Sequence, residues 1–420
     1  MTTTEGHLPT LIASFLHFDL SFMLWVLLGA LGIYIAEAAG LSPGEKGLMV
    51  AVPILSGALL RIPMGFLSDR FGGKRTGVAL LAFLFLPLAL GWQLGDSLPA
   101  LLGIGMLLGS AGASFSVALP LASRWYSPER QGLVMGIAAA GNSGTVVANL
   151  LAPRLASLVG WHNVLGLAML PLALVLLAFV LMAKDAPGRE TGRAQIPSQT
   201  MGWGDYLAAL KQRDMWWLCL FYSVTFGGYV GLSSFLPIFL RDQYRVSPAQ
   251  AGYLTALAAF VGSGVRPLGG YLADRFGGVR VLSALLLGIG AIYALVSQLP
   301  VLGALMGLVV VGMACLGLGN GATFQLVPGC FPRQIGVATG VVGAFGGLGG
   351  FVLSNLLGHG KEVSGSFGTG FLVLAGVAFG AFLLLRALVV VGDGWRISWR
   401  TRAEGASTGR VIMAPYLNVG

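Results

Sequence analysis

The segment RIPMGFLSDRFGGKR, residues 61–75, recurs later in the chain as RPLGGYLADRFGGVR, residues 266–280. Arginine, glycine and aspartate stand at the same relative positions in both copies, and both copies contain the loop Arg-Phe-Gly-Gly. A second pair of similar segments, residues 128–144 and 332–348, has nearly the same offset. The sequence therefore predicts two halves that share one architecture.

The composition predicts a membrane protein. Of the 420 residues, 56% are hydrophobic and only 10% are charged, whereas about 25% are charged in a soluble protein. The 65 glycines follow no collagen-like period, and the three cysteines have neither zinc-site nor redox spacing. These values exclude a soluble globule, a disordered chain and a disulfide scaffold. At about 20 apolar residues for each crossing of the bilayer, the chain has room for roughly twelve helices.

The apolar segments divide into two groups of six. They run over residues 11–36, 46–67, 76–94, 98–122, 132–158, 163–183, 215–240, 249–273, 280–299, 301–330, 334–358 and 370–391. We expect an all-α polytopic membrane protein with twelve transmembrane helices in two pseudo-symmetric halves. The predicted domains are a six-helix bundle at 1–183, a polar cytoplasmic linker at 184–213, a second six-helix bundle at 214–392 and a cytoplasmic tail at 393–420. Two parallel six-helix repeats are typical of transporters that work by alternating access.

The basic residues predict the orientation in the membrane. If the N-terminus is cytoplasmic, most of the 25 Lys and Arg residues fall in cytoplasmic segments, as the positive-inside rule requires. Both termini are then cytoplasmic, and the net charge of +9 reflects membrane topology rather than nucleic-acid binding. The first residues lack the features of a cleaved signal peptide, so we expect the first apolar segment to be retained.

Arginines inside apolar segments are the strongest indication of a binding site. Arg61 and Arg266 each lie eight residues before the aspartate of the repeated loop, about 12 Å along a helix. A guanidinium at a helix centre costs about 2.5–3.5 kcal/mol, so such a side chain normally faces a cavity or a partner. Only Asp19 and Glu37 supply carboxylates in a span. A small transported oxyanion, bound by the planar fork of arginine, is therefore the simplest partner.

Arg386 has no counterpart in the other half, and we expect it to extend along the apolar surface towards the headgroups.

The repeated loop resembles a known motif. The pattern Gly65-x-x-x-Asp69-Arg70-x-Gly72-Gly73-Lys74-Arg75 is similar to the motif between helices 2 and 3 of the major facilitator superfamily, with a weaker copy at 270–280. The resemblance implies the twelve-helix fold of that superfamily and leaves the substrate open.

Three further stretches resemble the nitrate/nitrite porter family. They are GNSG at 141–144, GLGNGATFQ at 317–325 and GAFGGLGGF at 343–351. The resemblance implies that nitrate is bound by one arginine from the second span and one from the eighth. The substrate-binding residues that it implies are Arg61, Arg266, Asn142, Phe115, Tyr222 and Phe226. The small residues of the glycine-rich spans are expected to let helices pack closely and slide, above all Gly141, Gly144, Gly346 and Gly347.

The mode of coupling is left open by the sequence. Asp19 is either the titratable group of a proton symporter or a structural acid in the first turns of a helix. His17 is expected to be hydrated near the membrane surface. Exchange of nitrate for nitrite, which moves no net charge, and proton-coupled nitrate uptake are both compatible with these residues.

The same residues would also suit a carrier of another small anion, such as formate or an organic acid, or a membrane nitrate receptor that does not transport. We expect a monomer in the inner membrane that is not an enzyme and has no catalytic residues, metal, cofactor or nucleic-acid partner.

Overall fold

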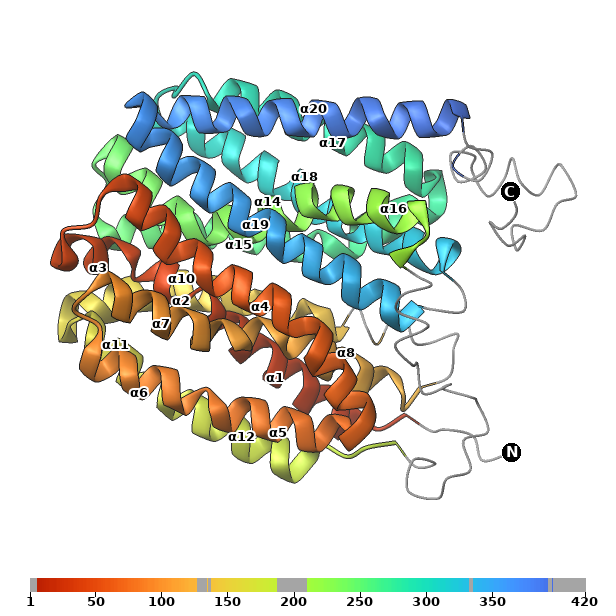
Figure 1. The fold of residues 1–420 in the computed structure, drawn as a ribbon, viewed down its shortest axis with the longest axis horizontal. Helices are drawn as coiled ribbons and strands as arrows, with labels where there is room; N and C mark the ends of the chain where they lie inside the picture. The colour runs from red at the N-terminus through yellow and green to blue at the C-terminus, as the bar shows by residue number, and fades with distance from the viewer. Residues whose placement is uncertain are drawn as a thin grey trace, which may run out of the picture. The chain divides into compact units, whose positions relative to one another are not determined.

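The structure is a computed structural model that describes residues 6–126, 134, 137–186, 210–331, 335–391 and 395 (Figure 1). The chain forms two compact units: unit 1 is Met1–Gly202 with Gly231–Leu257, and unit 2 is Trp203–Val230 with Ala258–Gly420. Every regular element in the described residues is a helix, which confirms the expected all-α class. The predicted boundary at 184–213 stays a prediction, because most of that linker and nearly all of the tail lie outside the described residues.

Unit 1 is built around the first helix of the chain. α1 packs against α8, η1, η2, α10 and α12, while α4 packs against α7 and η1. The elements of unit 1 are α1 (Leu8–Trp25), α2 (Leu27–Ala30), α3 (Gly32–Ala39), α4 (Pro43–Phe71), α5 (Gly73–Phe83), α6 (Phe85–Leu94), α7 (Leu98–Leu108), η1 (Gly109–Ser114), α8 (Phe115–Ser123), η2 (Ala140–Ser143), α10 (Gly144–Val159), α11 (Trp161–Leu167), α12 (Met169–Met182), the second part of α14 (Arg213–Tyr244) and the start of α15 (Pro248–Gly264).

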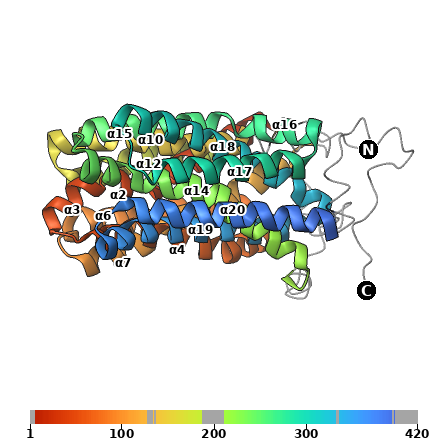
Figure 2. The same ribbon diagram turned by 90° about the horizontal axis from the view of Figure 1, so that it is seen from above.

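Unit 2 contains the remaining elements. α17 packs against α18 and α20, and α16 packs against α18. α17 and α20 lie side by side in both ribbon views (Figures 1 and 2). Besides the rest of α14 and α15, the elements of unit 2 are α16 (Arg266–Phe276), α17 (Gly278–Val296), α18 (Leu302–Cys330), α19 (Ile335–Ser364) and α20 (Phe367–Val391).

The expected spans coincide with these helices. Ten helical segments of the described residues are long and apolar enough to cross a membrane. The other two expected spans hold shorter helices, namely η2 with α10 in one and α15 with α16 in the other. The twelve-helix fold is therefore confirmed, and several spans contain breaks that the hydropathy pattern does not reveal, such as those between α5 and α6 and between α11 and α12.

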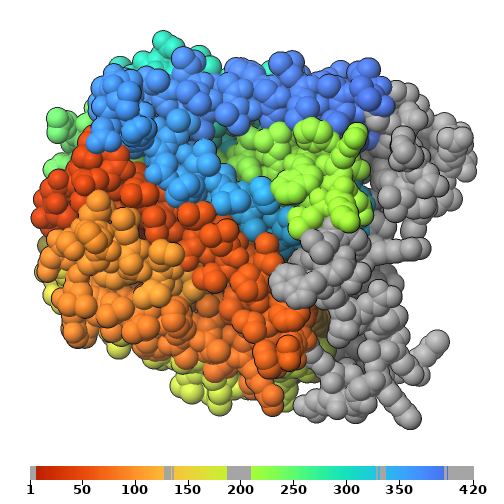
Figure 3. Space-filling view, in the orientation of Figure 1, coloured from red at the N-terminus to blue at the C-terminus, as the bar shows by residue number. Residues whose placement is uncertain are grey.

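The surface of the last helix is apolar, as expected of a helix that faces lipid. α20, blue in Figure 3, is exposed along its length. Its exposed large side chains are Leu372, Val373, Val377, Leu383, Val390 and Val391. A helix that exposes many large apolar side chains is typical of membrane contact.

The repeated loop folds in the same way in both copies. The helix before the loop ends at Phe71 in one copy and at Phe276 in the other, and a glycine with positive φ follows. The φ angles are 99° at Gly72 and 93° at Gly277, a region that side chains with a Cβ rarely adopt. The next helix begins at the following glycine. The sequence repeat thus corresponds to a repeated helix–turn–helix.

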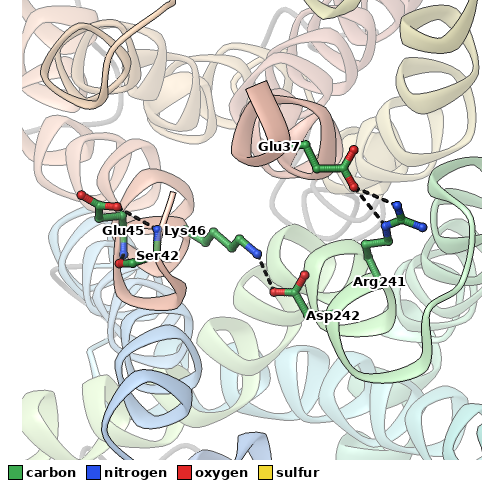
Figure 4. A network of polar contacts seen from close by, with 6 residues as sticks. All are labelled: Glu37, Ser42, Glu45, Lys46, Arg241 and Asp242. Carbon is green, nitrogen blue, oxygen red and sulfur yellow. Dashed lines mark hydrogen bonds and ion pairs between the residues drawn. The ribbon is translucent and has the colours of Figure 1, made fainter. Parts of the chain in front are cut away.

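One end of unit 1 is held by ion pairs between distant parts of the chain (Figure 4). Nε and Nη2 of Arg241 on α14 donate to Oε1 of Glu37 on α3 at 3.1 and 2.9 Å. Nζ of Lys46 on α4 donates to Asp242 at 2.7 Å. The second part of α14 is therefore tied to the first helices of the chain within unit 1.

Candidate anion-binding residues

Arg61 is completely buried on α4, in unit 1. Its Nε donates a hydrogen bond of 3.1 Å to the backbone oxygen of Gly112 in η1. Its guanidinium carbon lies 5.1 Å from the ring centroid of Phe115 and 5.3 Å from that of Trp25. Both distances are within the range of a cation–π interaction. The structure therefore brings together Arg61 and Phe115, two of the residues expected at the site, and adds Trp25.

Glycines make this arrangement possible. A Cβ on Gly112 would lie 2.4 Å from Cε2 of Trp25, and a Cβ on Gly57 would lie 2.6 Å from its Nε1. The 3₁₀ segment η1 ends at Ser114, so Phe115 begins a new α-helix. A short 3₁₀ stretch within a helical span is common at functional positions. The indole ring and the arginine thus share a space that only small residues leave open.

Asn142 lies in the second 3₁₀ segment, η2, and is 1% exposed. Its Oδ1 is buried and has no hydrogen-bond partner among the described residues. Leaving a buried polar atom unsatisfied costs about 1–3 kcal/mol, so this oxygen has capacity for a further donor, whereas only Nδ2 of the same amide could donate to an anion. Asn142 and Arg61 both belong to unit 1.

The glycines beside Asn142 pack against α1. A Cβ on Gly144 would lie 1.8 Å from the backbone oxygen of Asp19, and a Cβ on Gly141 would lie 2.8 Å from the backbone nitrogen of Asp19. Neither backbone atom can move aside as a flexible side chain could. These contacts are consistent with the close-packing role expected of the two glycines.

Asp19 and Glu37, the two carboxylates of the first span, bind other residues of unit 1. Ser143 Oγ donates to Asp19 at 2.6 Å, and Glu37 pairs with Arg241. The expectation for His17 was wrong, because its ring is fully buried rather than hydrated. Nε2 of His17 donates to the oxygen of Gly77 at 3.2 Å, so Nδ1 accepts from the hydroxyl of Ser114 at 2.6 Å. The neighbouring helices that bury His17 are not evident from the sequence.

Arg266, in unit 2, is half-buried at the start of α16. Its Nη2 lies 3.4 Å from the hydroxyl of Tyr222, which accepts a long hydrogen bond. Its guanidinium carbon lies 5.8 Å from the ring centroid of Phe324. The Nη1 atom is buried and has no hydrogen-bond partner among the described residues. Arg386, in contrast, is exposed on α20.

Three aromatic rings form a cluster beside Arg266. The rings of Tyr222 and Phe226 are stacked, with centroids 5.0 Å apart and planes at 5°. Phe324 meets Tyr222 edge-on at 4.7 Å. A Cβ on Gly346 of α19 would lie 2.4 Å from Cδ1 of Tyr222, so the glycine-rich span packs directly on the cluster. Gly347 is also buried.

Sequence reasoning missed Trp25 and Phe324 as neighbours of the two arginines. Phe324 lies in the stretch 317–325, which resembles a family motif, so its position contained a usable signal. Trp25 is an aromatic residue in an apolar helix, and nothing in its sequence context distinguishes it from a residue that only packs against its neighbours.

The fold and the repeated loop define a class of membrane transporter. The family model for the Major Facilitator Superfamily matches residues 13–354. Among solved structures, that of the nucleoside transporter NupG has a TM-score of 0.70 at 14% identity, covering 90% of this chain and 99% of that chain. A bacterial homologue of the human lysosomal transporter Spinster has a TM-score of 0.64 at 20% identity, covering 94% and 97%. At these sequence identities, the two structural similarities are evidence for the fold alone.

Curated relatives define the family more closely. The nitrite extrusion protein of Bacillus subtilis (strain 168) is 35% identical over 384 residues, covering 91% of this chain and 93% of the relative. A probable nitrate/nitrite antiporter, NarK1, of Thermus thermophilus is 33% identical over 416 residues, covering 91% and 92%. The chain belongs to the nitrate/nitrite porter family of the major facilitator superfamily. It is thus a multi-pass membrane transporter rather than an enzyme.

Proposed function

We propose that this chain carries nitrate and nitrite across the inner membrane by alternating access, with both termini in the cytoplasm. Arg61 and Arg266 bind the anion, and Asn142 donates a further hydrogen bond to it. The aromatic residues Phe115, Tyr222 and Phe226 exclude water from the bound anion, which strengthens the arginine contacts by lowering the local dielectric. We expect the monomer to be the working unit, because one chain supplies both arginines.

The observation that carries this proposal is the environment of Arg266. A buried N–H group without a hydrogen-bond partner is costly, and a buried guanidinium also needs an opposite charge. Its Nη1 is such a group, and the stacked rings of Tyr222 and Phe226 lie beside it. A planar oxyanion satisfies the donor, neutralises the charge and fits against flat rings. The names of the relatives supply the identity of that anion.

We further propose one-for-one exchange of nitrate for nitrite, since each ion bears one negative charge and exchange moves no net charge. Proton-coupled uptake is the competing mechanism, and Asp19 is the residue that would carry it. Its carboxylate is half-buried within a span and accepts a hydrogen bond from Ser143. Carboxylates at membrane depth commonly mark proton pathways.

Nitrate uptake into proteoliposomes at equal pH tests both mechanisms. Uptake that requires nitrite in the lumen supports exchange, and the variant Asp19→Asn should then keep the requirement for nitrite. Uptake that requires an inward proton gradient contradicts exchange, and Asp19→Asn should then abolish the response to that gradient. Uptake of formate or a dicarboxylate, but not of nitrate, in the same assay would identify a carrier of a different anion. Nitrate binding without flux, in folded protein, identifies a receptor.

A further inference from the structure

Trp25 lies between two parts of the same helix, α4. Its Nε1 donates a hydrogen bond of 2.8 Å to the backbone oxygen of Pro53, and its ring lies over the guanidinium of Arg61. Pro53 and Arg61 are eight residues apart, which is about two turns of helix. The indole therefore joins a fixed point on the backbone of α4 to the arginine side chain further along.

The indole itself has little freedom to move. Trp25 is 1% exposed, and Phe22 meets its ring nearly edge-on at 5.1 Å. Backbone surfaces at Gly57 and Gly112 lie so close to the indole that neither residue has room for a Cβ. Gly112 also provides the carbonyl that accepts from Nε of Arg61. Any movement of the indole would thus disturb the contacts that orient the arginine.

We propose that Trp25 is a positioning residue for Arg61, which fixes the plane of the guanidinium for the transported anion. This inference rests on the proposed function, in which Arg61 binds that anion. Five N–H donors in one plane make arginine selective for planar oxyanions, so the orientation of the plane determines how well the anion is bound. The Gly112 carbonyl accepts from Nε, while the rings of Trp25 and Phe115 lie within cation–π distance of the guanidinium carbon.

The hydrogen bond of Trp25 to Pro53 and its aromatic contact with Arg61 can be separated by substitution. Trp25→Phe keeps an aromatic ring and removes the hydrogen bond to Pro53, whereas Trp25→Leu removes both. A net hydrogen bond corresponds to about threefold to tenfold in an equilibrium constant. We expect Trp25→Phe to raise the KM for nitrate about threefold, and Trp25→Leu to raise it about tenfold or more because the cation–π contact is lost as well.

Trp92→Phe is the matched control. Trp92 also lies in unit 1, and its Nε1 donates to Oδ1 of Asn163 at 2.9 Å, away from Arg61. This variant loses an indole hydrogen bond and should keep the wild-type KM. A purely structural role of Trp25 would lower the amount of folded transporter and the maximal rate but leave the KM unchanged. A wild-type KM in folded Trp25→Phe and Trp25→Leu would overturn the proposal.

An experimental structure of Trp25→Phe separates this inference from the proposed function. We expect the guanidinium of Arg61 to lose its contact with the Gly112 carbonyl or to rotate relative to Phe115. An arginine that keeps both contacts refutes the positioning role whether or not the protein transports nitrate. If wild-type protein moves no nitrate but Arg61 is displaced in the variant, the proposed function fails and the positioning role stands.

Discussion

Arg61 and Arg266 occupy equivalent positions in the sequence repeat, yet their surroundings differ. Arg61 is fully buried, and a backbone carbonyl and two aromatic rings contact its guanidinium. Arg266 is half-buried and makes one long hydrogen bond to Tyr222, and its guanidinium carbon lies 5.8 Å from the ring centroid of Phe324. The repeat therefore preserves the position of the charge and the fold of the adjoining loop, but not the contacts that orient the side chain.

The backbones that support the two arginines also differ. Arg61 lies within the continuous helix α4, whereas Arg266 begins α16 directly after the break at Val265. If both arginines bind the anion as proposed, Arg61 is the more rigidly held of the two and Arg266 is the more adaptable. Substitutions in both units test this distinction.

The largest effect is expected from replacing either arginine by lysine. Arg61→Lys and Arg266→Lys should each lower nitrate uptake about a hundredfold or more, because an ammonium keeps the charge but loses the planar fork, and each charged hydrogen bond is worth about 1.5–3 kcal/mol. Only Arg61→Lys should also lower the melting temperature, since it alone loses a buried contact with a backbone carbonyl.

The control for this pair is Arg386→Lys, at an exposed position on α20. It should retain wild-type uptake and stability. Full transport by either Arg61→Lys or Arg266→Lys would contradict the assignment of that arginine to the anion. Equal loss of stability in both variants would contradict the distinction between a rigid and an adaptable arginine.

The arginines could be predicted from the sequence because a charge in an apolar span is costly and conspicuous. The repeated loop could be predicted as well, since the pattern Arg-Phe-Gly-Gly occurs at matching positions in both halves of the sequence. Phe115 was expected beside Arg61 from the resemblance, but two other contacts of Arg61 could not be predicted. One is the backbone carbonyl of Gly112, and the other is Trp25, whose sequence context is that of an ordinary packing residue. The break at η1 also leaves no signal, since Gly-Ser-Ala-Gly-Ala-Ser suits close helix packing equally well.

Gly144→Ala should be the most destabilising of the glycine substitutions. The new Cβ would lie 1.8 Å from the backbone oxygen of Asp19, so α10, which begins at Gly144, would have to move away from α1. Overpacking of this kind costs about 1–3 kcal/mol or more, which thermal unfolding in detergent would measure. Gly103→Ala, in the apolar helix α7, is the control, because a Cβ there meets no atom within 4 Å. Equal melting temperatures of the two variants would contradict the inference that α10 and α1 pack too closely at Gly144 to admit a Cβ.

Gly346→Ala should affect transport more than stability. Its Cβ would press on the ring of Tyr222 at 2.4 Å, and a side chain can move where a backbone cannot. We expect the KM for nitrate to rise about threefold to tenfold, equivalent to the roughly 1 kcal/mol of a modest repacking. Gly340→Ala lies on the same helix, where a Cβ meets no atom within 4 Å, and it should leave the KM unchanged. A wild-type KM in Gly346→Ala would show that the ring of Tyr222 does not shape the site.

The smallest effects are expected at the ion pairs that join the second part of α14 to the first helices of unit 1. Exposed pairs are worth about 0.2–1 kcal/mol, and less exposed pairs are screened less by water and salt. Lys46 and Asp242 are 18% and 25% exposed, whereas Arg241 and Glu37 are 35% and 55% exposed. A double-mutant cycle with Lys46→Gln and Asp242→Asn should therefore give a larger coupling energy than one with Arg241→Gln and Glu37→Gln.

Both couplings should shrink in high salt. The reverse order would mean that the two contacts of Arg241 with one carboxylate oxygen outweigh burial. A coupling near zero for both pairs would leave the backbone contacts of α14, such as Asn149 Nδ2 with the oxygen of Ser233 at 3.1 Å, as its attachment to unit 1. In that case the rigidity around Arg61 would depend on packing alone, and the ion pairs would contribute nothing to the difference between the two arginines.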